Sequence, residues 1–247
     1  APSLEMGFEA QMRKERNIKE NKARVSFDSE DDGPGWRVEF RPYELQLTDF
    51  ENAAYSILLV LFSRALLAQG YNFYMPISKV DENMQRSQQK DAVLNSKFYI
   101  RKNCFHSRQN LVENSTIVPS DSENMDVIEL SLDEIFNGVK GDTEGFPGII
   151  PSVYKYLERI GCDAITIGRL KPYLTLLAKR ASGELPTTAH WIREYVKSHP
   201  QYAHDGNINA VLNDELCQLC EDIGMGKIKA PELYGDAFIE NLNCFSK

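Results

Sequence analysis

Three charged residues alternate with apolar residues in one short segment. Arg37, Glu39 and Arg41 are separated by Val38 and Phe40. In an extended strand, side chains at i, i+2 and i+4 project to one face about 6 to 7 Å apart, giving a ladder of plus, minus, plus. Such a ladder is typical of a self-neutralising surface strand. It also suits a polar site in which Glu39 binds a hard cation and Arg41 binds phosphate or carboxylate.

The cysteines and histidines give weaker chemical signals. Cys217 and Cys220 would lie on neighbouring turns of a helix, but a closed zinc site needs four ligands, and no second pair has suitable spacing. We therefore interpret them as helix-packing residues. The histidines share no metal-ligand spacing and are read as surface or packing residues: His106, His190, His199 and His204. Phosphate-binding glycine loops, dinucleotide fingerprints and common hydrolase motifs are absent from the sequence.

Composition bounds the class of protein. The 247 residues are 42% hydrophobic, enough for one real core, and carry a net charge of -8. That charge disfavours a general nucleic-acid binder, because most of the surface would repel phosphates. Five scattered cysteines in a chain this long indicate reduced thiols and an intracellular location. The apolar stretch 53–63 is about half the length that a bilayer needs, so no transmembrane segment is expected.

The chain divides into an arm and one domain. Residues 1–35 form a charged arm, basic and then acidic, that ends in a Gly-Pro-Gly breaker. Residues 36–247 form the domain, with a polar loop or insertion at about 103–127. Since the sequence starts with Ala1 instead of methionine, we expect a processed product, a fragment or one piece of something larger.

The hydrophobic patterns predict an α+β fold that is predominantly α. One or two strands are expected at 36–47, with a kink at Pro42 where the alternation changes phase. Thr48 and Glu51 form a capping-box pattern that opens a buried helix over 48–69. Ser78 is expected to cap a second helix that runs to about 98. The second half is read as helices at 131–137, 151–160, 168–182, 188–198 and 209–223.

Four segments resemble one known family. They are Gly35–Pro42 (GWRVEFRP), Gln46–Tyr55 (QLTDFENAAY), Ser78–Met84 (SKVDENM) and Lys179–Thr187 (KRASGELPT). In this order and with similar separations, they resemble the catalytic chain of eukaryotic-type glutamate-cysteine ligase, in its C-terminal part only. That family joins the γ-carboxylate of glutamate to the amino group of cysteine through a γ-glutamyl phosphate, using ATP and Mg²⁺, in the first step of glutathione synthesis.

The resemblance implies a fold and two site residues. The family fold is similar to glutamine synthetase, a sheet funnel surrounded by helices, so this chain would be its C-terminal portion. Glu39 matches a carboxylate that ligates Mg²⁺, and Arg41 matches a catalytic arginine that steadies the transferred phosphate or the glutamate. The resemblance assigns no residue of this chain to cofactor binding beyond these two. Phosphoryl transfer is catalysed mainly by positioning and charge neutralisation, which suits these residue types.

Two possible functions follow from the family metal ligands that this chain lacks. The remaining family ligands are acidic residues far toward the N-terminus, and one carboxylate cannot hold two or three Mg²⁺ ions. The first reading is therefore a ligase half that needs an N-terminal partner half. Residues 16–24 depart from the family pattern before the strand, which favours a second reading, a non-catalytic ligase-derived subunit of a large assembly. Either reading implies partner proteins, in the cytoplasm or in an organelle such as the mitochondrial matrix or plastid stroma.

Overall fold

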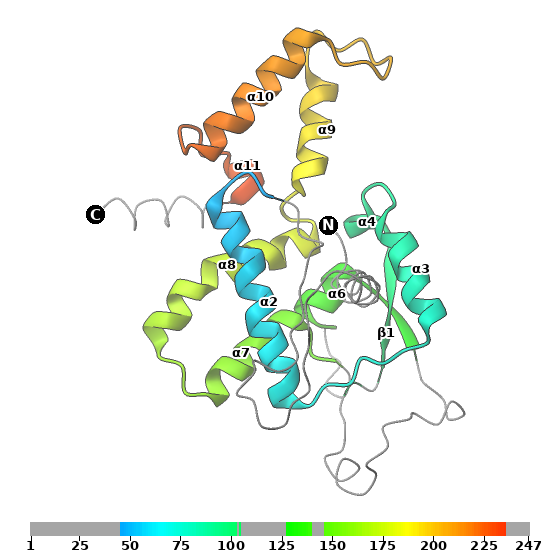
Figure 1. The fold of residues 1–247 in the computed structure, drawn as a ribbon, viewed down its shortest axis with the longest axis vertical. Helices are drawn as coiled ribbons and strands as arrows, with labels where there is room; N and C mark the ends of the chain where they lie inside the picture. Colours follow the sequence, from blue (N-terminus) through cyan, green and yellow to red (C-terminus); the bar gives the residue numbers. More distant parts are fainter. Residues whose placement is uncertain (1–44, 103, 105–126, 140–145, 236–247) are drawn as a thin grey trace, which may run out of the picture.

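The computed structural model describes residues 45–102, 104, 127–139 and 146–235. Within these ranges the chain is mostly helical with one small antiparallel sheet, which confirms the predicted α+β class (Figure 1). In chain order, the elements are α2 (Asp49–Gln69), α3 (Ile77–Ser87), α4 (Ala92–Asn95), β1 (Lys97–Arg101), β2 (Val127–Ser131), α6 (Leu132–Asn137), α7 (Ile149–Arg159), α8 (Ala164–Ser182), α9 (Thr188–Ser198), α10 (Ala210–Gly224) and α11 (Pro231–Tyr234).

Helix α2 confirms the helix predicted at 48–69. The Thr48 side chain accepts the Glu51 backbone N–H, and Gly70 ends the helix in the left-handed conformation with φ of 67°. By length and composition, α2 is the one helix in the described ranges that could cross a membrane, with a mean hydropathy of 1.3 over its most apolar window. Core helices of soluble proteins have the same property, so the expected lack of a transmembrane segment stays a prediction.

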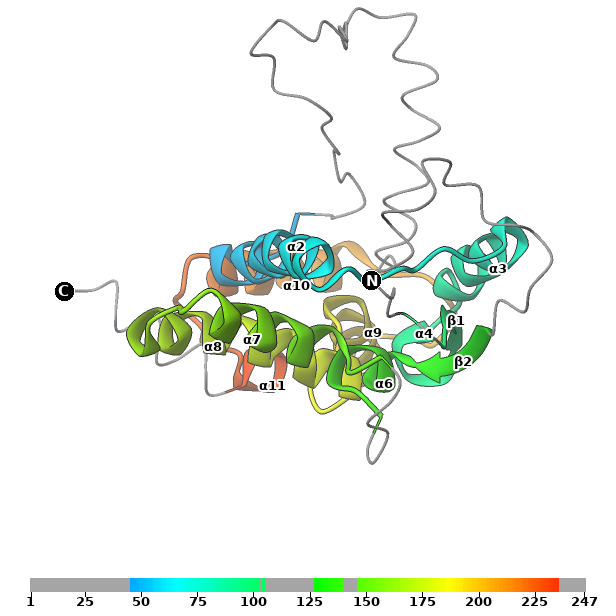
Figure 2. The same cartoon turned by 90° about the horizontal axis from the view of Figure 1, so that it is seen from below.

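The core lies where α2 crosses α7 and α8. Figure 2 shows α7 and α8 along one side of α2, and both helices pack against it. Leu58 and Phe62 of α2, Val153 and Leu157 of α7, and Leu174 of α8 are buried together in this layer. Helix α6 closes the layer by packing on α7 and α8. Its start is fixed by a complete capping box between Ser131 and Glu134, and its bounds confirm the helix predicted at 131–137.

The helix predicted over 78–98 is wrong in its second half. Helix α3 ends at Ser87, and its N-cap is Pro76 instead of Ser78. The chain then turns through α4 and enters β1, which pairs antiparallel with β2 in the register Phe98 to Leu130. Phe98 and Ile100 alternate with more exposed residues, so β1 buries one face. Pairing with β2 and burial of Ile100 in the hydrophobic core outweigh the weak helical pattern of this segment.

The other helices match their predictions within a few residues. Helix α9 has the predicted bounds, whereas α7 and α8 begin two and four residues earlier than the starts predicted at 151 and 168. On α10, Leu212 and Ile223 are buried, whereas Val211 is 53% exposed. Figure 1 shows α9 and α10 extending together from the end of α8.

Several predicted features lie outside the described residues. These are the arm 1–35, the strand segment 36–44 and nearly all of the loop at 103–127. Residues 45–47 are described and are not in a strand, so the strand prediction fails for these three positions. In the predicted loop, Cys104 is buried, and Val127 already begins β2. Pairing with β1 explains why the loop ends there.

Candidate functional site

The predicted charged ladder ends at Arg41, four residues before Leu45, which is the first residue that the structure describes. Arg37, Glu39 and Arg41 themselves lie outside the described residues, so their arrangement stays a prediction. Covalent geometry still limits their position, because an extended chain advances by at most about 3.3 to 3.6 Å per residue. Arg41 is four residues before Leu45, so its Cα lies within roughly 14 Å of the Leu45 Cα.

A buried ion pair fixes the start of α2. Glu51, in the first turn of α2, is fully buried, and Arg180, near the end of α8, is 5% exposed. Arg180 Nη1 donates to Glu51 Oε1, which also accepts the Thr188 hydroxyl at 3.1 Å. The Tyr234 hydroxyl donates to Glu51 Oε2 at 3.1 Å. The carboxylate therefore joins α2, α8, α9 and α11 at one point.

The electrostatics of this network keep the Arg180 guanidinium charged. Burial by itself lowers the pKa of the Arg180 guanidinium, but the adjacent Glu51 carboxylate and Tyr55 leave that pKa raised. Burial, together with the Glu51 charge, raises the pKa of the Tyr234 hydroxyl, which stays a neutral donor. Within the described ranges, Arg180 Nε and Nη2 are buried without a hydrogen-bond partner. The guanidinium carbon of Arg180 lies over the Tyr234 ring, 5.9 Å from its centroid, so the ring is placed for a cation–π contact.

The turn after α8 delivers Thr188 to this network. Gly183 ends α8 at φ of 80°, and a Cβ on it would lie 2.5 Å from Leu94 Cδ2. Both the left-handed backbone and this close approach favour glycine. The Leu185 N–H donates to the Lys179 carbonyl at 3.1 Å, and the Thr187 side chain caps α9. The KRASGELPT segment thus forms a tight connection between α8 and α9. This connection places the Thr188 hydroxyl within hydrogen-bond distance of Glu51.

The SKVDENM segment has a structural role on α3. Asn83 is fully buried, and its side chain exchanges two hydrogen bonds with the Tyr99 backbone, at 2.9 and 2.7 Å. Beside it, Arg86 donates to Glu82 at 2.7 Å and to Glu129 at 2.9 Å. The Glu129 and Glu82 carboxylates raise the pKa of Arg86 further above its usual range. These contacts tie α3 to both strands.

A third polar cluster joins the α3–α4 turn to α9. Asp91 has a left-handed backbone with φ of 55°, and its Oδ1 lies 2.9 Å from His190 Nδ1. The same carboxylate accepts a hydrogen bond from Arg193. The bond to His190, then the bond to Arg193, lowers the pKa of Asp91 below its ordinary value of 3.8. A lowered pKa means that the folded state favours the ionised carboxylate.

The substitution Asp91→Asn should destabilise the fold in a pH-dependent way. Asparagine tolerates the left-handed backbone, so the variant removes mainly the charge. At pH 7 we expect a loss of about 1 kcal/mol in the free energy of unfolding, because the pair is partly exposed. Above pH 3.8 the full difference should be present, and it should vanish as the pH falls through the lower folded-state pKa. Urea unfolding measures this, and a pH-independent difference would contradict it.

The described residues do not supply a metal site. Among residues 45–102, 104, 127–139 and 146–235, no group of three or more His, Cys, Asp or Glu side chains could hold a metal ion. Burial raises the pKa of the Cys104 thiol to about 12, so this cysteine is a protonated core residue. On α10, Cys217 is exposed and Cys220 is half-buried, and the pKa of Cys220 is raised by burial. Glu39, the predicted Mg²⁺ ligand, lies outside the described residues, so the predicted Mg²⁺ site stays a prediction.

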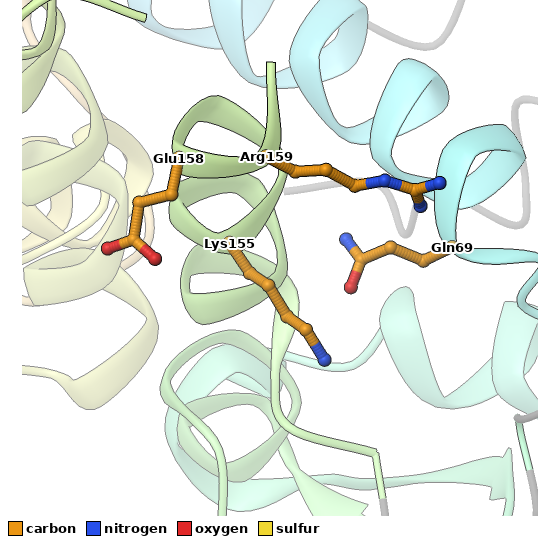
Figure 3. Close-up of a pocket in the computed structure, with 4 residues that line it drawn as sticks. All are labelled: Gln69, Lys155, Glu158 and Arg159. Carbon is orange, nitrogen blue, oxygen red and sulfur yellow. The ribbon is translucent and has the colours of Figure 1, made fainter. Parts of the chain in front are cut away.

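An open hollow lies between the end of α2 and α7. It is lined by Gln69, Lys155, Glu158 and Arg159. Figure 3 shows Lys155 and Arg159 pointing toward Gln69, while Glu158 points away. Arg159 donates to the Ala68 carbonyl, and Gln69 donates to the Ser152 carbonyl at 2.9 Å. The first bond caps the end of α2 and the second ties α2 to α7, so the hollow marks a contact between the two helices.

Comparison with known proteins identifies the family. A family model described as glutamate-cysteine ligase matches residues 19–223, most of the chain. The chain belongs to the glutamate-cysteine ligase family. The glutamate-cysteine ligase catalytic subunit of Mus musculus is 43% identical over 206 residues, which cover 83% of this chain and 32% of that relative. The glutamate-cysteine ligase of Schizosaccharomyces pombe is 43% identical over 182 residues, 74% of this chain and 26% of that relative.

The chain spans about a third of the length of the mouse catalytic subunit, 32%. Two of the segments that resemble the glutamate-cysteine ligase family, QLTDFENAAY and KRASGELPT, meet at the Glu51–Arg180 pair. Two segments that resemble the family are therefore joined in the fold by this buried ion pair. Because this junction is buried, its hydrogen bonds hold α2, α8, α9 and α11 together.

Sequence reasoning missed this junction. It assigned Glu51 to the capping box of α2, and Thr48 does accept the Glu51 N–H at 3.2 Å. The Glu51 carboxylate, however, binds Arg180 from 129 residues away. A carboxylate placed just before a long apolar run was the available signal, because burial of such a group requires a charged partner. The identity of that partner depends on tertiary packing.

Proposed function

We propose that this chain is the C-terminal portion of a glutamate-cysteine ligase, which joins glutamate to cysteine at the expense of ATP. The observation that carries the proposal is the family match over residues 19–223, a range that includes Glu39 and Arg41. In this proposal Glu39 is a Mg²⁺ ligand, and Arg41 steadies the transferred phosphate or the glutamate. Both residues belong to one strand of a glutamine-synthetase-like sheet.

The proposed role of the described domain is to hold this strand. Helix α2 starts within eight residues of Arg41, and its first turn is fixed by the Glu51 network. A displacement of the catalytic groups by about 1 Å can reduce a rate by about 100-fold, so a rigid support matters for phosphoryl transfer. A buried ion pair with two further hydroxyl donors provides such a support.

The proposed ligase is incomplete without a partner half. Glu39 is one carboxylate, whereas Mg²⁺ held by protein needs several oxygen ligands. The described residues contain no group of three acidic, His or Cys side chains that could supply the others. The chain also has only about a third of the length of the mouse relative, at 32%. We infer that an N-terminal ligase half completes the sheet and supplies the remaining carboxylates.

Activity of the native assembly tests the proposal. The full chain is purified with its natural partners and incubated with glutamate, cysteine, ATP and Mg²⁺. The expected result is cysteine-dependent formation of γ-glutamylcysteine, together with a copurifying chain that resembles the N-terminal part of a glutamate-cysteine ligase. Absence of both the product and such a chain would reject the proposal.

One observation favours a second function. Residues 16–24, just before the predicted strand, lack the tryptophan and hydroxyl residues that the resemblance leads us to expect. Loss of selection on the site would permit such changes, so a non-catalytic, ligase-derived subunit of a large assembly is the alternative. In that case the native assembly contains no N-terminal ligase half and makes no γ-glutamylcysteine. Reduced cysteines fit a cytoplasmic, mitochondrial or plastid location for either function.

A further inference from the structure

Three positions in the sequence place an aspartate or asparagine directly before a glycine: Asp32, Asn137 and Asp205. At such a pair the glycine backbone nitrogen can attack the side-chain carbonyl carbon, because glycine has no side chain that shields this nitrogen. The succinimide ring that results opens to aspartate or to isoaspartate, in which the main chain runs through the side chain. Asp32 lies outside the described residues, so Asn137 and Asp205 are the two whose surroundings can be compared.

The fold protects Asn137 from this reaction. Its side-chain nitrogen donates to Asp133 Oδ1 at 2.6 Å and to the Ala178 carbonyl at 3.1 Å. The Gly138 N–H donates to a carbonyl of α6 at 3.0 Å, and a Cβ on Gly138 would lie 2.4 Å from the Pro147 carbonyl oxygen. Ring closure would break these hydrogen bonds inside a closely packed contact. Asn137 should therefore react only when this region unfolds.

The surroundings of Asp205 are open. Asp205 and Gly206 lie in the exposed connection between α9, which ends at Ser198, and α10, which begins at Ala210. Among the described residues, no hydrogen bond holds the Gly206 N–H. Gly206 has φ of 83°, and apart from its chain neighbours no atom lies within 4 Å of a Cβ built on it. The attacking nitrogen is therefore neither bonded nor shielded by packing.

The Asp205 carboxylate is folded back over the loop. Its Oδ1 accepts the Asn207 N–H at 2.9 Å, and its Oδ2 accepts a hydrogen bond from the Asn207 side-chain nitrogen at 3.3 Å. A side chain that bonds the backbone two residues on forms an Asx turn, which brings its carboxyl carbon alongside the intervening peptide and thus the Gly206 nitrogen. The backbone bond, then the side-chain bond, lowers the pKa of Asp205. The protonated form that loses water is therefore scarce at neutral pH, and the reaction is slow.

We propose that Asp205 is a site of spontaneous isoaspartate formation in the folded chain, and so a substrate for an isoaspartyl carboxyl methyltransferase. The Gly206 nitrogen attacks Asp205 Cγ, and the N–H proton leaves with the carboxyl hydroxyl as water. Water then adds to the main-chain carbonyl of the succinimide, which leaves the peptide bond on Cγ and frees an α-carboxylate. The methyltransferase transfers a methyl group from S-adenosylmethionine to this carboxylate. The chain gains one backbone carbon between α9 and α10.

Prolonged incubation of the full chain tests this site and needs no ligase activity. The folded chain is kept at neutral pH for several weeks, and samples are treated with an isoaspartyl methyltransferase and labelled S-adenosylmethionine. Peptide mapping with electron-transfer fragmentation locates each isoaspartate. Isoaspartate at position 205 should rise with time, accept methyl groups and exceed that at position 137 at least about tenfold. In denaturant, position 137 should become reactive too, because its protection comes from the fold.

A matched pair of glycine substitutions gives a second readout. Gly206→Asn keeps a residue that tolerates the left-handed backbone and adds a side chain that shields the nitrogen. It should slow isoaspartate formation at position 205 by on the order of tenfold. Gly161→Asn makes the same change at another open, left-handed glycine, with φ of 68°, and should leave that rate unchanged. The proposal is overturned if the folded chain forms no isoaspartate at position 205, if positions 205 and 137 react equally, or if the two variants behave alike.

Discussion

Replacing Arg180 by methionine should lower the free energy of unfolding by about 3 to 5 kcal/mol. The substitution removes the cation from a fully buried pair and leaves the Glu51 carboxylate in the core. The hydroxyls of Thr188 and Tyr234 would still donate to Glu51, but neither neutralises its charge. Denaturant unfolding of the full chain measures the loss. The effect should be large because an unpaired buried charge costs more than the pair contributes.

The adjacent residue provides a matched control. Lys179 forms an exposed ion pair with Glu184, with side-chain exposures of 38% and 60%. Lys179→Met should therefore cost under about 1 kcal/mol. The double variant Glu51→Gln with Arg180→Met should be more stable than Arg180→Met alone, because no isolated charge stays buried. Equal losses from Arg180→Met and Lys179→Met would show that the buried pair has no special role.

Replacing Glu39 by glutamine should reduce γ-glutamylcysteine formation by the native assembly by on the order of 100-fold or more. Glutamine keeps the size of the side chain and removes the negative charge that the proposal assigns to Mg²⁺ binding. Because phosphoryl transfer depends on neutralising the charge of the phosphates, a lost ligand should lower the turnover rate and raise the Mg²⁺ concentration required. Initial rates measured over a range of Mg²⁺ concentrations give both quantities.

A distant glutamate separates this effect from a general change of charge. Glu194 is exposed on α9, where it pairs with Lys197 at 2.7 Å. Glu194→Gln removes one negative charge at a position outside the proposed site, so the rate should stay unchanged. A rate for Glu39→Gln equal to that of Glu194→Gln would exclude Glu39 as a metal ligand.

The helix ends that are fixed by local capping were predictable from the sequence. Thr48 and Gly70 fix both ends of α2 through local backbone chemistry, and Ser131 with Glu134 fixes the start of α6. Such caps need no tertiary information, because the groups that bond lie within one turn of each other. The same holds for the start of α9 at Thr187, whose side chain accepts the His190 N–H.

Long-range pairing was not predictable in the same way. The predicted helix over 78–98 has sparse apolar residues, and the strand β1 at its end depends on pairing with β2, about 30 residues later. Glu51 has a plausible local role as a capping residue, while its partner Arg180 lies 129 residues away. Asp91, His190 and Arg193 are likewise brought together only by the fold. The family resemblance found the relevant segments, but not the contacts between them.

Isotope transfer tests the central claim most directly. The native assembly is incubated with cysteine, ATP, Mg²⁺ and glutamate that carries oxygen-18 in its γ-carboxylate. In the proposed reaction a carboxylate oxygen attacks the terminal phosphorus of ATP and releases ADP. The cysteine amine then displaces phosphate, which keeps that oxygen. We therefore predict one labelled oxygen in inorganic phosphate for each γ-glutamylcysteine formed. An assembly that contains this chain and an N-terminal ligase half, yet forms neither labelled phosphate nor γ-glutamylcysteine, would contradict the proposed ligase function.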